Sequence, residues 1–522
     1  MFRAMSRHFN TAGPCVPERH YMLPPERRLP GVRALIDELA YFVVHAPRQV
    51  GKTTALHALA QDLVREGRYA AVLVSMEDGV AFPEDIGAAE DAILASWQFT
   101  AETRLPAELQ PPAWPDAAPG ARIGSALAAW ARVCPRPLVL FLDEIDALQG
   151  HVLLSVLRQL RSRYALRPEA FPASLALIGL RDVRDYKVAS GGSERLHSSS
   201  PFNIKVESLT VRDFTADEVA ELYAQHTAET GQRFTPEAQS RAFAVSQGQP
   251  WLVNALARQI VNVVVPDRGA EVTEDDIDRA RDLLIERQDT HLDSLAERLR
   301  EPRVRAVIEP MIQGEALDAV PPDDLRFVVD LGLVRRTPDG RVEIANPIYR
   351  EIIIRSLTTT VQASIPVLTP SWLDAAGRMD WAALREAFTG FWLEHGESLL
   401  GSSPYNEAAA HLVLMAFLHR VVNGGGRVDR ELAIGSRRMD LCVAYKGDRL
   451  GIEVKTWRDT DKARDPADEG VAQLDAYLAR IQVARGWLVR FDQRAAAAPL
   501  PDRMRVEHVT TARGSQVTRI LL

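Results

Sequence analysis

The stretch APRQVGKTT, residues 46–54, constrains the fold of this chain more than any other. It follows YFVVHA, an apolar run typical of a buried strand, and it opens TTALHALAQDLVREG, whose apolar residues recur at helical spacing. In a strand–loop–helix of this kind, backbone N–H groups curl around phosphate oxygens, a lysine reaches the β- and γ-phosphates and a hydroxyl meets Mg²⁺. The expected nucleotide contacts are Ala46, Pro47, Arg48, Gln49, Val50, Gly51, Lys52, Thr53 and Thr54.

A second apolar run, PLVLFLDEI, ends in Asp143 and Glu144. A buried strand here delivers Asp143 to the edge of a sheet, where it helps Thr53 to hold Mg²⁺, and Glu144 polarises an attacking water. The plain alternative is a strand that ends in a solvated acidic turn. The upstream loop, at an ordinary spacing, favours the nucleotide site.

Further runs between these two and after them, YAAVLVSM and SLALIGL, alternate with amphipathic helices, which predicts a parallel sheet covered on both faces. The chain of 522 residues is long enough for about three or four domains. Its three cysteines are far apart, its N-terminus lacks an apolar leader and no run is long enough to span a bilayer. We therefore expect a cytoplasmic α/β protein of several domains, with no membrane partner.

The loop and the acidic strand resemble those of AAA-like and STAND-related P-loop ATPases, over roughly residues 10–300. The likeness extends to SPFNI at Ser200 and to GQPWLVNALA at Gly248, which is similar to the turn before a lid helix in that group. The sequence departs from it at Ala46, where the family has glycine. The resemblance implies ATP and Mg²⁺ as cofactors. It also implies a polar sensor after the fourth strand, for which Arg181, Arg184 and Arg195 are candidates, and a surface turn is the alternative.

After this core the pattern changes to helices over 206–300 and then to two helices and a short hairpin over 301–360. The turn dipeptide Asp339-Gly340 marks the hairpin, and the order is typical of a winged helix. Its arginines, Arg335, Arg336 and Arg341, are candidates for phosphate contacts, with a packing module as the alternative reading. The expected boundaries are an arm over 1–30, an ATPase core over 31–205, a helical lid over 206–300, a winged-helix-like module over 301–360, a helical linker over 361–400 and a last domain over 401–522.

A second cluster lies in RRMDLCVAYKGDRLGIEVKTW, which predicts two strands joined at Lys446-Gly447-Asp448. Glu453 and Lys455 are two residues apart and share one face of their strand, and antiparallel pairing brings Asp440 alongside them. Carboxylates and a lysine at one point are what metal-dependent phosphodiester cleavage requires. The plain alternative is a charged hairpin with a surface ion pair.

The order of helix, Asp strand, E-x-K strand and Q-x-x-x-Y helix resembles the PD-(D/E)XK nuclease superfamily, over about residues 400–495. The resemblance implies a restriction-endonuclease-like α/β domain. It assigns Asp440 and Glu453 as metal ligands, Lys455 as the catalytic lysine, Glu407 as the helix carboxylate and Gln473 as a substrate or metal-shell residue. Met439 stands where the motif name has proline.

Together the two resemblances imply an ATP-dependent or ATP-regulated, metal-dependent DNA nuclease that uses Mg²⁺, or Mn²⁺ at the second site. Such pairings are typical of prokaryotic genome-defence and mobile-element proteins, and a homo-oligomer is expected. Two alternatives stay open. One is a nucleotide switch that binds DNA or a partner through a non-catalytic nuclease-like domain, and the other is a DNA motor without cleavage. The net charge of −8 argues that contact with DNA is confined to a site.

Overall fold

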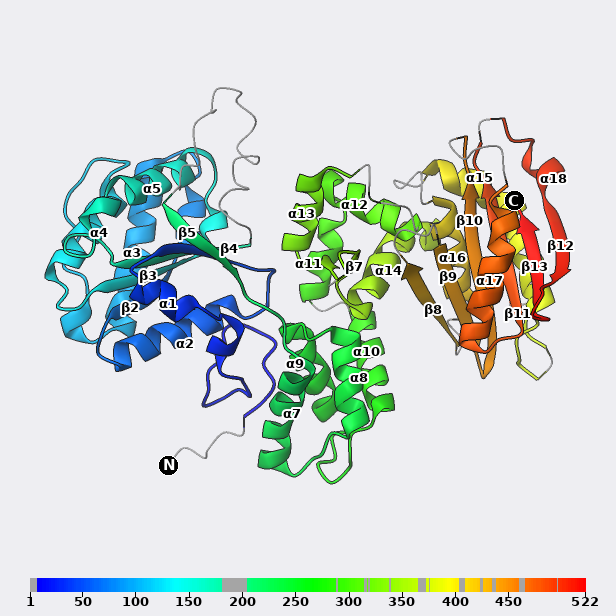
Figure 1. Ribbon diagram of the computed structural model, residues 1–522, viewed down its shortest axis with the longest axis horizontal. Coiled ribbons are helices and arrows are strands. Elements are labelled where there is room, and N and C mark those ends of the chain that lie inside the picture. Colours follow the sequence, from blue (N-terminus) through cyan, green and yellow to red (C-terminus); the bar gives the residue numbers. More distant parts are fainter. Residues whose placement is uncertain are drawn as a thin grey trace. The chain divides into compact units, whose positions relative to one another are not determined.

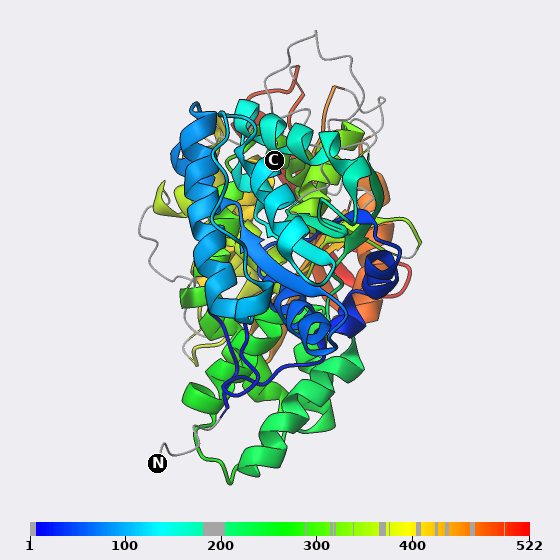
Figure 2. The same cartoon turned by 90° about the vertical axis from the view of Figure 1, so that its left-hand side faces the viewer.

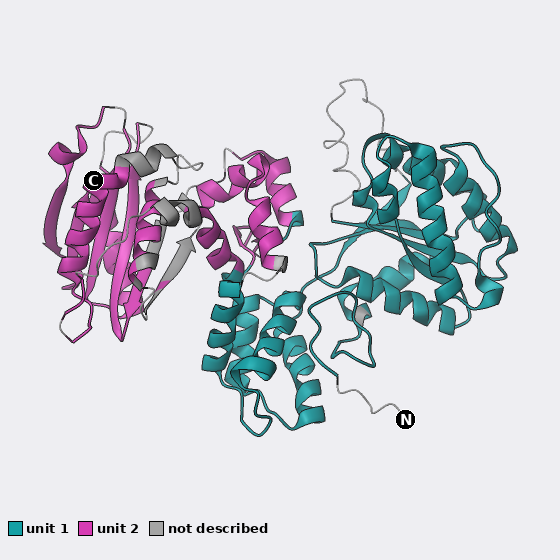
Figure 3. Cartoon of the chain, turned by 180° about the vertical axis from the view of Figure 1, so that it is seen from behind, with its two compact units in different colours: residues 1–291, 330–332, 346–348 teal, residues 292–329, 333–345, 349–522 magenta. Residues whose placement is uncertain are grey.

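The computed structural model describes residues 7–522 except 181–203, 288–289, 314–316, 318–319, 338, 365–371, 375, 403–408, 423–425, 434–437, 460–464 and 495. For some further helix and strand residues, among them Asp440, only the backbone is described. The chain divides into two compact units, coloured separately in Figure 3. Unit 1 comprises residues 1–291, 330–332 and 346–348, and unit 2 comprises residues 292–329, 333–345 and 349–522.

Unit 1 contains a five-stranded sheet in the order β2-β3-β4-β1-β5, and all its strands are parallel. The strands are β1 (Tyr41–His45), β2 (Ala70–Ser75), β3 (Leu138–Asp143), β4 (Ser174–Gly179) and β5 (Lys205–Thr210). The first four match the apolar runs of the sequence. The parallel sheet expected for the ATPase core is therefore present.

Helices cover both faces of this sheet (Figure 1; Figure 2). One face packs on α1 (Val32–Asp37) and α2 (Lys52–Arg65), and the other packs on α3 (Ile86–Arg104), α4 (Arg122–Val133) and α5 (Gly150–Ser162). The proline-rich stretch after α3 is anchored on the core, because Leu105 and Leu109 are buried. Two opposed apolar layers hold the sheet rigid, and the loops at its carboxyl edge build the site.

Four helices follow in unit 1, namely α7 (Ala216–Thr230), α8 (Pro236–Ser246), α9 (Pro250–Gln259) and α10 (Glu274–Arg287). Threonine side chains cap the N-termini of α7 and α8. Thr215 accepts a hydrogen bond from the backbone of Glu218 at 3.2 Å, and the Glu218 carboxylate accepts one from the Thr215 N–H at 2.9 Å. Thr235 caps α8 with a single bond, which its Oγ1 accepts from the Ala238 N–H at 3.0 Å. These caps fix where each helix begins.

Unit 2 opens with helices and a hairpin. The helices are α11 (Thr290–Arg298), α12 (Pro302–Gln313) and α13 (Pro322–Asp330), and the hairpin pairs β6 (Val334–Arg336) with β7 (Val342–Ile344). Gly340 in the turn has a φ of +83°, as the turn dipeptide predicts. The helix α14 (Pro347–Ser364) runs past the expected boundary at 360 into the first residues of the expected linker.

The rest of unit 2 is built on a six-stranded mixed sheet in the order β12-β13-β11-β10-β9-β8. Its strands are β8 (Gly426–Ala433), β9 (Arg438–Tyr445), β10 (Asp448–Trp457), β11 (Arg485–Asp492), β12 (Arg505–Thr510) and β13 (Gln516–Leu521). The β8-β9-β10 strands are antiparallel and β10-β11 are parallel. The helices are α15 (Trp381–Ser402), α16 (Ala409–Val422), α17 (Ala467–Ile481) and the short α18 (Leu500–Arg503).

Across the described ranges, every helix is either too short or too polar to cross a lipid bilayer.

Candidate functional site

The loop between β1 and α2 has the shape that its sequence predicts. Gln49 and Gly51 have positive φ values of 59° and 86°, so the backbone turns sharply before α2 begins at Lys52. The Ala46 side chain is buried at 1 % exposure among the apolar residues beneath the loop. The methyl group that departs from the family pattern is thus accommodated by the core, away from the open side of the loop.

Arg28, which the sequence analysis did not single out, holds the loop from behind. Its Nη2 donates to the Val50 carbonyl at 2.6 Å and its Nε donates to the Arg212 carbonyl at 2.8 Å. A Cβ at Gly51 meets Arg28 Nη1 at 3.3 Å, which is a second reason for glycine there. Burial lowers the pKa of Arg28 to about 10, so the guanidinium stays charged at neutral pH. Its partners are distant in sequence, and no local pattern identifies it.

Lys52 lies folded over the phosphate loop. Its Nζ donates to the carbonyls of Ala46 at 2.6 Å and Pro47 at 2.8 Å. Burial lowers the pKa of Lys52 to about 8, and the nearby Asp143 carboxylate opposes that effect. The ammonium therefore lies at the loop with two carbonyl acceptors. A nucleotide phosphate is able to take their place, because its charge makes a stronger hydrogen bond with the ammonium.

Thr53 and Asp143 meet at the carboxyl edge of the sheet. Thr53 Oγ1 donates to Asp143 Oδ2 at 2.8 Å, joining the first residues of α2 to the end of β3. Burial raises the pKa of Asp143, and the Thr53 hydrogen bond opposes this effect. A hydroxyl and a carboxylate are the hard oxygen ligands that Mg²⁺ prefers, so this pair fits the predicted cation.

Glu144 follows directly and is held in the left-handed region with a φ of 58°. Its Oε2 accepts a hydrogen bond from Ser75 Oγ at 2.8 Å, and Ser75 lies at the end of β2 in register with Asp143. The Glu144 carboxylate is the main cause of the raised pKa of Glu77. Ser75 and Glu77 are further site residues that the sequence analysis missed. They lie at the end of a strand that it did predict.

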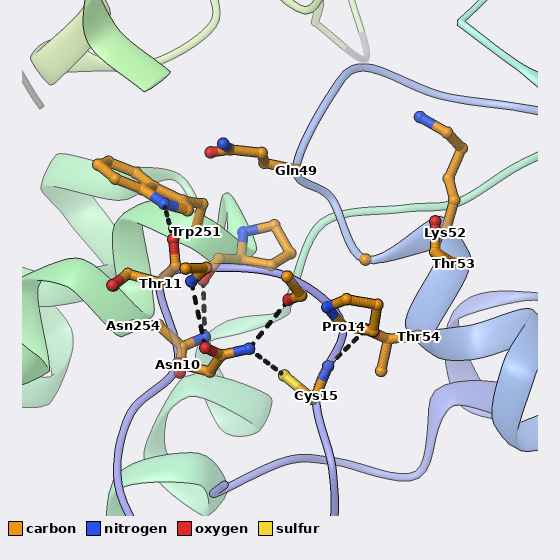
Figure 4. Close-up of a pocket in the computed structure, with 14 residues that line it drawn as sticks. Asn10, Thr11, Pro14, Cys15, Gln49, Lys52, Thr53, Thr54, Trp251 and Asn254 are labelled. Atoms are coloured by element: carbon orange, nitrogen blue, oxygen red, sulfur yellow. Dashed lines mark hydrogen bonds between the residues drawn. The ribbon is translucent and has the colours of Figure 1, made fainter. Parts of the chain in front are cut away.

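A cavity of about 260 Å³ lies beside the loop (Figure 4). It is lined by the arm over 10–15, by the loop and the first residues of α2, and by Pro250, Trp251 and Asn254 of α9. The backbone N–H of Cys15 donates to Thr54 Oγ1 at 3.0 Å and Trp251 Nε1 donates to the Thr11 carbonyl at 2.9 Å. The arm is thus tied both to α2 and to α9 and forms one wall of the cavity.

One polar atom in this cavity lacks a partner. Asn254 Nδ2 donates to the Pro250 carbonyl at 2.8 Å, whereas Asn254 Oδ1 is buried and has no hydrogen-bond donor among the described residues. A buried acceptor without a donor is costly, so the site favours a ligand that supplies one. Arg181, the expected sensor, lies outside the described residues.

The second predicted cluster lies on β10 and α17. Glu453 is fully buried and its Oε1 lies 2.7 Å from Lys455 Nζ, which also donates to Gln473 Oε1 at 2.7 Å. The plain alternative, an exposed surface ion pair, is therefore wrong for Glu453 and Lys455. Asp440 pairs directly with Glu453 in the β9–β10 register, as antiparallel pairing predicts.

The metal-binding part of this cluster is only partly described. The Asp440 side chain and the whole of Glu407 lie outside the described part of the structure. Among the described side chains, no group of three or more His, Cys, Asp or Glu residues is placed to hold a metal ion. Cys442 is buried against α17, on the face that it shares with Asp440.

Two of the three hairpin arginines are already engaged. Arg335 lies 2.5 Å from a Glu343 oxygen and Arg341 lies 2.6 Å from an Asp339 oxygen. Both pairs are exposed, so each is weak and a competing anion is able to displace it.

No protein-family model matches this sequence, and no curated protein sequence matches it either. Among solved structures, a Walker-type ATPase of Pyrococcus abyssi aligns at 12 % identity and a TM-score of 0.46, covering 66 % of this chain and 99 % of its own. The Thermotoga maritima RuvB Holliday junction branch migration motor aligns at 15 % identity and a TM-score of 0.33, covering 63 % and 92 %. The Aeropyrum pernix ORC1 protein in complex with DNA aligns at 14 % identity and a TM-score of 0.34, covering 88 % and 95 %. Similarity this low carries no argument about activity, which must come from the residues of this chain.

Proposed function

We propose that unit 1 binds and hydrolyses ATP. The hydrogen bond between Thr53 and Asp143 carries this proposal, because it joins the phosphate loop to the acidic strand at the place where a nucleotide's Mg²⁺ is held. The cavity beside it is walled by the arm and α9 and takes the nucleoside. Asn254 Oδ1 there is a buried acceptor, and a base that carries an amino group supplies the donor that it lacks.

The chain's own groups divide the work of hydrolysis. Backbone N–H groups of the loop and Lys52 hold the phosphates. Thr53 and Asp143 are the residues that would hold Mg²⁺, which would supply positive charge to offset that on the phosphate oxygens. Ser75 holds the Glu144 carboxylate in position by a hydrogen bond. Once that bond breaks, Glu144 accepts the hydrogen bond of the attacking water.

The test separates binding from turnover. Glu144→Gln should lower ATP hydrolysis at least about 100-fold, since it removes a general base, and should leave ATP affinity unchanged. Lys52→Ala should lose both. Glu84→Gln, at an exposed carboxylate outside the site, is the matched control and should keep both. Full turnover by the Glu144→Gln variant refutes the assignment.

We propose a second function for unit 2, cleavage of nucleic-acid phosphodiester bonds. The buried pair of Glu453 and Lys455, with the half-buried Gln473 bonded to Lys455 and Asp440 opposite Glu453, carries this proposal. The order α16, β8, β9, β10, α17, β11 supports it, because it agrees with the order of motifs in the resembled nucleases. Glu453 is fully buried and Lys455 is 6 % exposed, and taking both charges out of water costs free energy, so the pair is weak evidence for a purely stabilising role.

At this site Lys455 orients a water or a phosphate oxygen and Gln473 fixes the Lys455 ammonium. Asp440, Glu453 and Glu407 are the residues that would hold a divalent cation, which supplies hydroxide and neutralises charge. Wild-type protein should cut DNA with Mg²⁺ or Mn²⁺, and Lys455→Ala and Asp440→Ala should not. If wild-type protein cuts no plasmid, linear DNA, single strand or RNA, with or without ATP, the non-catalytic switch replaces the nuclease.

The coupling of the two units completes the proposal. ATP binding or hydrolysis in unit 1 licenses cleavage by unit 2 on a DNA substrate, in a homo-oligomer. The domain boundaries given above and the winged-helix reading of α12, α13 and the hairpin belong to the same proposal.

A further inference from the structure

The strand next to Lys455 carries a second buried cation. In the parallel pairing of β10 with β11, Lys455 lies beside Arg490 and Trp457 lies beside Asp492. Residues two apart on a strand share a face, so Lys455, Trp457 and Arg490 lie on the same face of the sheet, the face where Gln473 of α17 contacts Lys455. Lys455 and Arg490 are only 6 % and 5 % exposed. Two like charges side by side in a buried place are unfavourable unless anions offset them.

The carboxylate that faces Arg490 uses only part of its guanidinium. Arg490 Nη1 lies 2.5 Å from Asp465 Oδ2, while Asp465 Oδ1 accepts a hydrogen bond from the Ala467 N–H at 2.9 Å, at the start of α17. Asp465 is therefore shared between the arginine and the helix terminus. The Nε donor of the guanidinium remains for a second acceptor.

Two donors at this place are left over. Among the described residues, Arg490 Nε and Trp457 Nε1 are buried and have no hydrogen-bond acceptor. They belong to neighbouring side chains, because the Arg490 guanidinium carbon lies 5.0 Å from the centre of the Trp457 ring. Arg494 covers the same ring at 3.3 Å and is itself fixed by two bonds to Asp492 at 2.8 and 2.6 Å. The Trp457 ring is thus held in position, and its free N–H is held with it.

We propose that Arg490 and Trp457 form a phosphate-binding site beside Lys455, and that it holds non-bridging oxygens of a nucleic-acid phosphodiester; this rests on the proposed nuclease function. Buried donors without acceptors call for a group rich in acceptors, and phosphate presents oxygens in the geometry of an arginine fork. The place of Arg490, next to Lys455 in the strand register, sets this phosphate at the reacting site.

Binding is measured first, under conditions in which no strand is cut. A fluorescein-labelled DNA oligonucleotide is titrated with the full chain in Ca²⁺, and fluorescence anisotropy is followed at several salt concentrations. Arg490→Gln should weaken binding and reduce the slope of log K against log salt by about 1. Arg485→Gln, at an exposed arginine on the same strand, should change neither. Equal affinities and slopes for Arg490→Gln and wild type overturn the phosphate site.

The double variant Asp465→Asn with Arg490→Gln separates this role from a structural one, because it leaves no unpaired charge. It should bind as weakly as Arg490→Gln alone. Recovery of wild-type affinity in the double variant shows that Arg490 only neutralises Asp465, and it overturns the proposal.

Cleavage is measured next, with Mg²⁺ and saturating DNA in a single turnover. Arg490→Gln should slow cleavage about 100-fold or more, as loss of one donor to a reacting anion does, and Arg490→Lys should not restore the rate because it lacks the fork. If the wild type binds DNA through Arg490 but cuts none, the nuclease proposal is wrong and the phosphate-site proposal stands. If the wild type cuts DNA and the Arg490→Gln variant cuts it equally fast, the phosphate-site proposal is wrong and the nuclease proposal stands.

Discussion

At the scale of single residues, the proposed nucleotide site depends on side chains whose pKa burial has shifted. Lys52 is the main case, because burial lowers its pKa to about 8 and it already donates to two loop carbonyls. A bound phosphate stabilises the protonated form. Binding of ATP and protonation of Lys52 are therefore linked, and each favours the other.

We expect ATP affinity to fall as the pH rises above about 8. Below that pH the free protein already carries the Lys52 proton. Above it, ATP binding must take up a proton, so the Kd should rise by up to about tenfold per pH unit. Isothermal titration between pH 7 and pH 9 measures this. Lys52→Ala should bind weakly with no such pH dependence, and a flat wild-type profile contradicts the assignment of Lys52.

Arg28 gives a stability prediction with a neighbour as its control. Arg28→Met keeps the aliphatic stem but loses the bonds to Val50 and Arg212, so unit 1 should lose about 2–3 kcal/mol of stability. Arg27→Met removes only an exposed ion pair with Glu221 and should cost less than about 1 kcal/mol. Thermal unfolding of the two variants decides this, and equal losses contradict the role of Arg28.

At the scale of elements, the hydrophobic pattern is enough to predict a strand wherever that strand is buried on both faces. The strands β1 to β4 are such runs, and all four were predicted. The strand β5, with the sequence KVESLT, lies at the edge of its sheet and is largely exposed. Its residues alternate too little for a pattern to show. The predicted boundary at 360 falls before the end of α14 for a related reason. The last turns of this helix are Thr-rich and polar and have low helix propensity.

The same limit applies to the sites. The loop over 46–54, Asp143 and Glu453 follow from short motifs, because backbone geometry fixes neighbours along one strand or one turn. Ser75, Arg28 and Arg490 contribute through packing between segments that are distant in sequence. The order of strands brings Ser75 and Arg490 to their sites, and the segment before α1 packs Arg28 against the loop. Neither arrangement can be read from a single sequence.

The strand β10 provides an element-scale prediction. Glu453→Ala leaves the buried Lys455 without its carboxylate, which should destabilise the strands around it by about 3–5 kcal/mol. Replacing both residues by Leu and Met should cost clearly less, because no charge is then left buried. Hydrogen exchange of peptides from β9 to β11 reports the local stability. If the β9–β11 peptides of Glu453→Ala exchange no faster than those of the double variant, an unpaired Lys455 carries no cost of burial, which contradicts the prediction.

At the scale of the whole molecule, the two compact units carry chemically different sites. Unit 1 presents a phosphate loop and a cavity, and unit 2 presents a buried carboxylate–lysine line with arginines beside it. The net charge of −8 is compatible with a nucleic-acid substrate when the contacts gather at such a site. Separate sites imply that each activity is removable without the other.

The most direct measurement follows ATP hydrolysis and DNA cleavage in one reaction, with Mg²⁺, for wild type, Lys52→Ala and Lys455→Ala. The account predicts that wild type does both and that Lys52→Ala loses ATP hydrolysis. It predicts that Lys455→Ala keeps ATP hydrolysis and cuts no DNA. Hydrolysis of ATP that survives Lys52→Ala, or cleavage that survives Lys455→Ala, contradicts the account.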